Sequence, residues 1–109
     1  MKTLKEKINV TLADAEQKAK DLIKDEALRV AKCWEPILIE AAESGKTERR
    51  FTEMTRQLAE KFENATDLTT RCYLGCIAEY YRSEGLTVSG PHKITNVNGF
   101  QMEIRVTLT

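Results

Sequence analysis

Residues 3–34 carry one uninterrupted amphipathic pattern, and its length limits what the chain can fold into. At about 100° per residue, the apolar side chains of this stretch share one arc of a helix, with charged side chains opposite. A straight helix from Thr3 to Cys33 spans about 45 Å, whereas a compact chain of 109 residues has a radius of gyration of about 13 Å. The helix must therefore overhang, bend or meet a partner. The apolar arc consists of Leu4, Ile8, Leu12, Ala15, Ala19, Leu22, Ile23, Ala27, Val30, Cys33 and Trp34.

The start of this helix has two signals. Thr3 with Glu6 and Thr11 with Asp14 both have the spacing of a capping box, so the helix begins at one of them or bends between them. An overhanging end would expose an apolar surface that soluble monomers rarely leave bare. We expect either a monomer whose helix bends near residues 9–11 or a homodimer with a two-fold interface, formed by Leu4, Ile8, Leu12 and Ala15.

The charged face of the helix carries acid-first pairs with i,i+4 spacing, which predict ion pairs within the helix and a solvated surface. These pairs are Asp14 with Lys18, Glu16 with Lys20 and Asp25 with Arg29.

Two helix breakers follow. Pro36 cannot continue a helix, so a short second helix begins with Pro36 at its first position, ends near Ser44 and is stopped by Gly45. The sequence Gly45-Lys46-Thr47 is also how a phosphate-binding loop ends. However, Glu40 replaces the first glycine of that motif, and the segment follows a helix where the motif follows a strand. We therefore expect a helix stop and no nucleotide site.

The middle of the chain is ambiguous at "KTERRF", where an edge strand and a helix both fit the pattern. We expect a short strand over residues 47–52, followed by a helix of about three turns from Glu53. The sequence "NATD" at residues 64–67 then caps a strongly apolar helix that runs to Glu84. This is the expected central core helix, and Gly85 is placed to end it.

From Leu86 onward the pattern changes to period two, which indicates strands with one face on the core and one in water. Asn98-Gly99 is a hairpin signal, so residues 93–97 should pair with residues 100–104. Residues 86–89 either extend the first of these strands or form a third. The sequence thus predicts one α+β domain over residues 1–109, with a C-terminal β-hairpin in a small antiparallel sheet covered by helices on one face.

Composition excludes several classes of protein. Hydrophobic residues at 41% and charged residues at 31% are typical of a soluble globular chain, and no segment resembles a signal peptide or a membrane span. The 17 basic residues balance 17 acidic residues, so direct nucleic-acid binding is disfavoured and no membrane partner is expected. Three cysteines without a secretory context indicate reduced thiols and a cytoplasmic location.

Candidate chemistry is sparse. Cys33, Cys72, Cys76 and His92 could hold zinc on paper, but their spacing differs from that of known zinc sites, so we expect buried thiols and no metal or cofactor. No nucleophile has a base at catalytic spacing, and we expect no catalytic residues and no enzyme. The one local excess of positive charge is formed by Arg49, Arg50 and Arg56. It is either part of a mixed-charge surface or a contact with an acidic partner or a phosphate.

The order of elements resembles that of small accessory proteins of phages and prophages. The resemblance covers the whole chain and includes the helix ending "EYYRSEGLTVS" and the hairpin "VNGFQMEIRVTL". It implies a non-catalytic protein-binding module, such as an anti-CRISPR-like inhibitor of a host defence nuclease. The expected partner is then a larger host protein, such as a nucleic-acid-guided nuclease. The alternative is a self-assembling phage structural or small regulatory protein whose main partner is itself.

Overall fold

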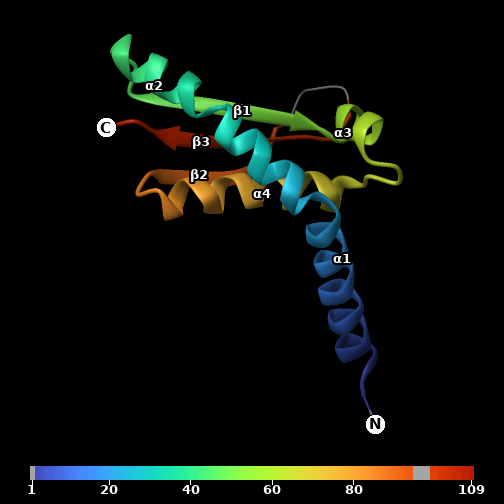
Figure 1. Cartoon of the computed structure of the whole chain (residues 1–109). Coiled ribbons are helices and arrows are strands. Elements are labelled where there is room, and N and C mark those ends of the chain that lie inside the picture. Colours follow the sequence, from blue (N-terminus) through green and yellow to red (C-terminus); the bar gives the residue numbers. More distant parts are fainter. Residues whose placement is uncertain (1, 95–98) are drawn as a thin grey trace.

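The structure is a computed structural model in which residues 2–94 and 99–109 are described. The fold is α+β, as the sequence predicts (Figure 1). Along the described chain the elements are α1 (Leu4–Cys33), α2 (Glu35–Glu43), β1 (Glu48–Met54), α3 (Thr55–Lys61), α4 (Asp67–Ser83), β2 (Thr87–Ile94) and β3 (Gln101–Thr107).

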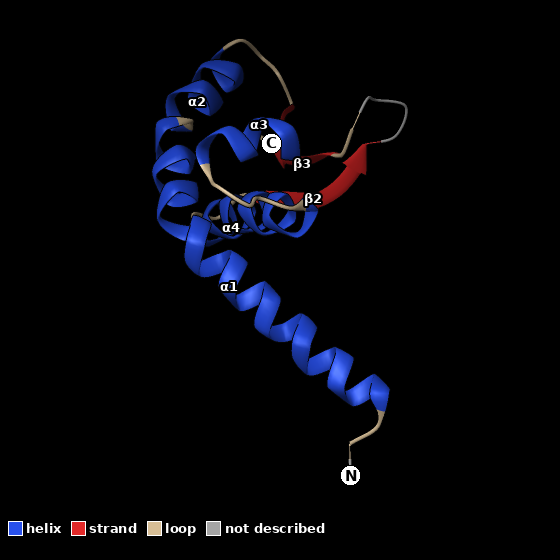
Figure 2. Cartoon of the chain, turned by 90° about the vertical axis from the view of Figure 1, so that its right-hand side faces the viewer, coloured by secondary structure: helices blue, strands red, loops and turns tan. Residues whose placement is uncertain are grey.

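The first helix begins at the earlier of the two predicted start signals. The Thr3 hydroxyl accepts a hydrogen bond from the Glu6 N–H at 3.2 Å, and α1 then continues to Cys33 without a break. The Thr11 hydroxyl donates to the Lys7 carbonyl at 2.9 Å, a bond within the helix. Thr11 therefore begins no second helix. The expected bend near residues 9–11 is also wrong, because the N-terminal part of α1 is straight and the helix changes direction only where it meets the body (Figure 2).

The second helix ends at a glycine, as expected. Pro36 lies in the first turn of α2, and Gly45 beyond its last turn has a φ of +81°. The Gly45 N–H donates to the Ala42 carbonyl and the Lys46 N–H donates to the Ala41 carbonyl, which is the Schellman pattern of a helix end. The Gly45-Lys46-Thr47 sequence thus closes a helix, whereas a phosphate loop opens one.

The strand after Gly45 is longer than expected and the next helix is shorter. We expected a helix of about three turns from Glu53, but β1 runs to Met54 and α3 has only 7 residues from Thr55. The reason is pairing with β3, because Glu53 lies opposite Met102 and Met54 lies opposite Gln101. Ladder hydrogen bonds therefore override the local helical pattern.

The three described strands form an antiparallel sheet in the order β1-β3-β2, with β3 in the centre. Residues 87–89 belong to β2, the first strand of the hairpin, and Leu86 lies just before it. An irregularity between Ser89 and His92 shifts the register of β2 on β3. The expected pairing of residues 93–97 with 100–104 is wrong by two residues, because Lys93 lies opposite Met102. A slip of two residues keeps every side chain on its own face, so alternation cannot detect it. The Asn98-Gly99 turn lies partly outside the described residues.

The core lies between one face of the sheet and the helices, which gather on that side (Figure 2). Helix α4 covers β2 and β3, and the junction of α1 with α2 covers β1, where Trp34 stacks on Phe51 at 4.3 Å between ring centroids. The Tyr81 hydroxyl donates to the Ala31 carbonyl at 2.9 Å and ties α4 to α1. As predicted, α4 is the central core helix and alternate β3 residues face it. The buried residues of these two elements include Tyr73, Leu74, Ile77, Tyr81, Met102, Ile104 and Val106.

Candidate interaction surfaces

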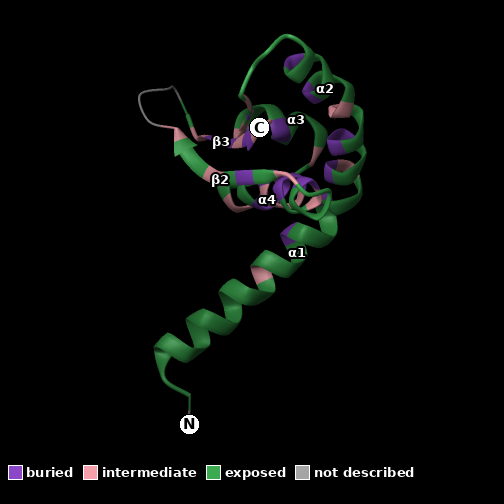
Figure 3. Ribbon diagram, turned by 90° about the vertical axis from the view of Figure 1, so that its left-hand side faces the viewer, coloured by how far each residue is buried: buried purple, intermediate pink, exposed green. Residues whose placement is uncertain are grey.

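The N-terminal half of α1 projects from the body of the protein (Figure 1). The buried residues of α1 begin at Ala19 and continue to Ala31, and the described residues before Ala19 are exposed except for the half-buried Ala15. Figure 3 shows this exposed stretch as a separate arm. The radius of gyration is 15.6 Å and the longest dimension is 57 Å, compared with a radius of about 13 Å for a compact chain of this length. We call residues 4–18 the projecting segment.

One face of the projecting segment is apolar. Leu4 is 73% exposed, Ile8 is 48% exposed and Leu12 is 53% exposed. Ala15 continues their line toward the core, and we call these four residues the apolar row. They are the residues expected at a dimer interface, and the structure places them on one exposed face. Val10 is also 48% exposed, but it lies about 200° around the helix from Ile8.

Charged side chains of both signs flank the apolar row. At about 100° per residue, Lys5 and Glu16 lie on one side of the row, and Lys7 and Asp14 lie on the other. Among the residues that the structure describes, these four side chains have no ion-pair partner. They are therefore available to a molecule that covers the row.

The ion pairs of α1 differ from those expected at i,i+4 spacing. Asp21 pairs with Lys24 at 3.9 Å, and Arg29 pairs with Glu26 where Asp25 was expected. The hydrogen bond from Arg29 lowers the pKa of Glu26. Exposed pairs on a helix differ in energy by only tenths of a kcal/mol, so small differences in side-chain geometry decide which of them form.

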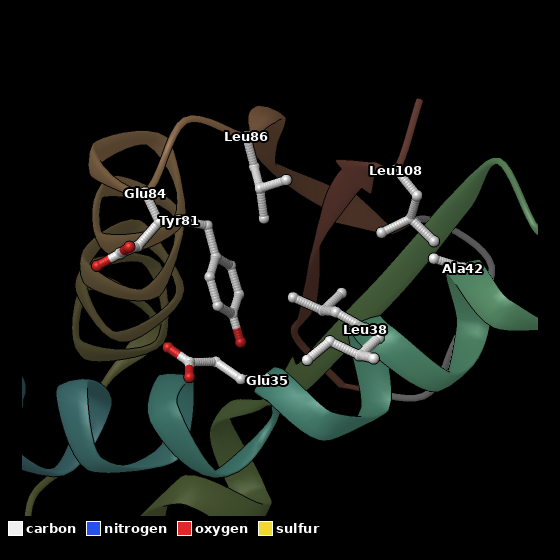
Figure 4. A pocket seen from close by; sticks show the side chains of 8 residues that line it. Glu35, Leu38, Ala42, Tyr81, Glu84, Leu86 and Leu108 are labelled. Carbon is white, nitrogen blue, oxygen red and sulfur yellow. The ribbon is translucent and has the colours of Figure 1, made fainter.

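A second surface is a groove between α2 and the C-terminal end of α4 (Figure 4). Its volume is about 410 Å³, which falls within the range of small-ligand sites. Carboxylates stand at its rim. Sequence reasoning missed this groove because its residues come from separate elements and share no spacing. The groove is lined by Glu35, Leu38, Ile39, Ala42, Tyr81, Glu84, Leu86 and Leu108.

The Glu35 carboxylate at this rim is already engaged. It accepts a hydrogen bond from the hydroxyl of Tyr80, and that bond raises the pKa of Tyr80 to about 12. Desolvation raises the pKa of the neighbouring Tyr81 as well. Both phenols therefore stay neutral at physiological pH.

The three arginines predicted to contact a partner do not form one patch. Arg49 lies on the helix-covered side of β1, with its guanidinium carbon 5.4 Å from the centre of the Phe51 ring. Arg50 lies on the opposite face, where it pairs with Glu48 at 3.2 Å, and Arg56 lies on α3. Adjacent strand residues point to opposite faces, so the local charge excess in the sequence is divided in space. The prediction that these residues bind a partner stays a prediction.

The three thiols differ in exposure. Cys72 is buried and Cys76 is half-buried, and desolvation raises the pKa of both. Cys33 is exposed, so the expectation of a buried thiol is wrong for this residue. It ends α1 where the chain turns into α2, and its sulfur faces the guanidinium of Arg29 at 3.9 Å. The described residues contain no group of three or more His, Cys, Asp or Glu side chains that could hold a metal ion.

Comparison with known proteins does not assign the chain to a family. No protein-family model, curated protein or solved structure matches the chain. In the part of the chain that the structure describes, the helices are too short or too polar to cross a membrane.

Proposed function

We propose that the chain is a non-catalytic protein-binding module and that the projecting segment is its docking element. The observation that supports this proposal is the apolar row, in which Leu4, Ile8 and Leu12 are exposed on a helix that extends beyond the body. Each large aliphatic side chain that a partner covers contributes about 1.5–3 kcal/mol relative to full exposure in water. Burying the row therefore favours association.

The charges beside the row favour a protein over other partners. A helix that lies on an anionic membrane carries lysine and arginine on its polar face, and a nucleic-acid contact needs an excess of positive charge. Here each flank of the row carries one lysine and one acid, Lys5 with Glu16 on one side and Lys7 with Asp14 on the other, and the whole chain has no net charge. A partner helix with its own charges of both signs fits this pattern better than a phosphate surface does.

Two kinds of partner follow from the proposal. The first is a larger host protein, such as a nucleic-acid-guided nuclease that an anti-CRISPR-like phage inhibitor would block in the cytoplasm. The resemblance in size and element order supports it. The second is another copy of the same chain, in a self-assembling structural or regulatory protein. The charges that flank the apolar row favour this second partner.

A pull-down with a matched pair of variants tests the docking element. Ile8→Asp places a charge in the apolar row, and Val10→Asp places the same charge at an equally exposed position on the opposite face. Wild-type protein and Val10→Asp should retain the partner from a bacterial lysate, and Ile8→Asp should not.

The identity of what is retained separates the two partners. A large host protein supports the inhibitor, whereas untagged copies of the bait support self-assembly. Retention that is equal for Ile8→Asp and Val10→Asp would show that the projecting segment is not the docking element.

A further inference from the structure

We propose that the projecting segment pairs with the same segment of a second copy as an antiparallel two-helix interface, with its two-fold axis level with Val10 and Thr11. This inference rests on the proposed function, because it names the occupant of the same surface. It adds the direction of the two helices and the residues that meet.

The charges flanking the apolar row define the axis. In an antiparallel pair of identical helices, each flank faces the same flank of the partner, with the chain direction reversed. The midpoint between Lys5 and Glu16 lies between Val10 and Thr11, and so does the midpoint between Lys7 and Asp14. A single axis therefore places Lys5 opposite the partner's Glu16 on one flank and Lys7 opposite the partner's Asp14 on the other.

The apolar row agrees with the same axis. Ile8 comes within about one residue of the level of the partner's Leu12, and the symmetric contact repeats on the other side of the axis. Alternating large side chains can then interdigitate along the seam, as in a short coiled coil. Charge and apolar surface thus select one register.

A parallel pair is disfavoured on two grounds. In that arrangement opposite flanks meet, which brings Lys5 near the partner's Lys7 and Glu16 near the partner's Asp14. Like charges would face each other on both sides of the seam. A parallel pair also places the two bodies side by side at one end of the helices. The antiparallel pair places them at opposite ends.

The base of the projecting segment offers a place for the partner's N-terminal end. A largely apolar hollow of about 170 Å³ lies where α1 meets α4, and its lining includes Glu16, Cys72 and Pro91. With the axis level with Val10 and Thr11, the partner's Leu4 comes within about one residue of the level of Glu16, which lies at the rim of this hollow. The most exposed residue of the apolar row is thereby brought next to apolar surface of the other body.

Sedimentation or light scattering on purified protein tests the dimer. We expect a mass of twice 12.4 kDa well above micromolar concentration, because an interface of this size is at the weak end of specific complexes. Ile8→Asp should return the mass to that of one chain, and Val10→Asp should not. Circular dichroism should show both variants folded, since neither side chain contacts the core.

Charge reversal tests the register. Lys5→Glu combined with Lys7→Glu should raise the dissociation constant about tenfold or more, because four attractive contacts become repulsive. Adding Asp14→Lys and Glu16→Lys should restore it. In the antiparallel pair, spin labels on Leu4→Cys in a Cys33→Ser background should lie about 20 Å apart along the seam, and in a parallel pair they would be adjacent.

Each outcome decides a separate point. A mass of one chain at every concentration, or a dimer unaffected by Ile8→Asp, overturns this inference. If the protein is monomeric but still captures a different protein in an Ile8-dependent way, the proposed function stands and the self-pairing is rejected. The antiparallel register is rejected if the spin labels at Leu4→Cys are adjacent in the dimer. It is also rejected if the variant with all four charges reversed does not recover the dissociation constant of the wild type.

Discussion

Alanine substitutions at three glycines measure how far the backbone of β2 depends on close packing against β3. Gly75 lies inside α4, and a Cβ atom added there meets no other atom within 4 Å. Alanine loses less conformational freedom on folding than glycine does, so Gly75→Ala should raise the free energy of unfolding by about 0.5–1 kcal/mol. This variant is the control for the general effect of adding a methyl group.

Gly45 and Gly90 both have positive φ, but only Gly90 is also crowded. At Gly45 the φ is +81° and a Cβ meets nothing within 4 Å, so alanine costs only the left-handed conformation, about 1–2 kcal/mol. At Gly90 the φ is +104°, and a Cβ would lie 2.7 Å from the backbone oxygen of Glu103 and 3.3 Å from the Cα atom of Ile104. These are main-chain atoms of the central strand, so they cannot move without disturbing the ladder. The strain and the overlap together cost about 2–5 kcal/mol.

Urea denaturation followed by circular dichroism gives the comparison. If the slope of the unfolding free energy against urea concentration is the same for all four proteins, Gly75→Ala should have the highest urea midpoint. The wild type should come next, followed by Gly45→Ala and then Gly90→Ala. Each kcal/mol corresponds to about 4–8 °C in melting temperature for a domain near this size, so Gly90→Ala should melt about 10 °C or more below the wild type. If Gly90→Ala proves as stable as Gly45→Ala, β2 does not approach β3 at this point as the structure shows.

Three further predictions concern titratable groups. Cys33 is exposed and Cys72 is buried, so a thiol reagent should modify one thiol per folded chain rapidly, and equally fast reaction of all the thiols would contradict that difference. Desolvation raises the pKa of Glu53, so the stability contributed by its neutral form is present at low pH and lost as the pH rises through that raised pKa. Glu53→Gln should therefore match the wild type below about pH 4 and exceed its urea midpoint at neutral pH, where an unchanged midpoint would refute the reasoning. The hydrogen bond to Glu35 raises the pKa of Tyr80 to about 12, so its stabilising effect should persist to about pH 10 and disappear as the pH rises through 12. An ultraviolet tyrosinate titration should lose that step in Tyr80→Phe, and a Tyr80 that titrates at its ordinary value would count against the bond.

Features that depend on neighbours in the sequence were predictable. The ends of α1 and α2 follow from Thr3 and Gly45, since a cap is a hydrogen bond between residues a few positions apart. The apolar pattern of α4 likewise identified the core helix, because a helix places every third or fourth residue on one face. The residues of the apolar row were predictable for the same reason.

Features that depend on contacts between distant segments of the chain were not predictable from the sequence. Pairing of β1 with β3 extended the strand to Met54, and the irregularity near Gly90 set a register that alternation cannot distinguish from one shifted by two residues. The groove at Glu35 exists only because α2, α4 and the chain near Leu108 meet there. Its residues share no motif that a sequence pattern could show.

The projecting segment depends partly on the local sequence and partly on the tertiary structure. The sequence alone determined that residues near the N-terminus form one long helix with a continuous apolar stripe, because periodicity and the Thr3 cap act within the helix itself. Only the tertiary structure decided that the body covers this stripe from Ala19 onward. Helix α4 has 17 residues and α1 has 30, so at 1.5 Å per residue α4 spans about 25 Å against about 45 Å for α1. The buried part of α1, from Ala19 to Ala31, is shorter than α4, and toward its N-terminus α1 leaves the body at a steep angle to α4 (Figure 1). The apolar row is therefore the part of the stripe that extends away from α4.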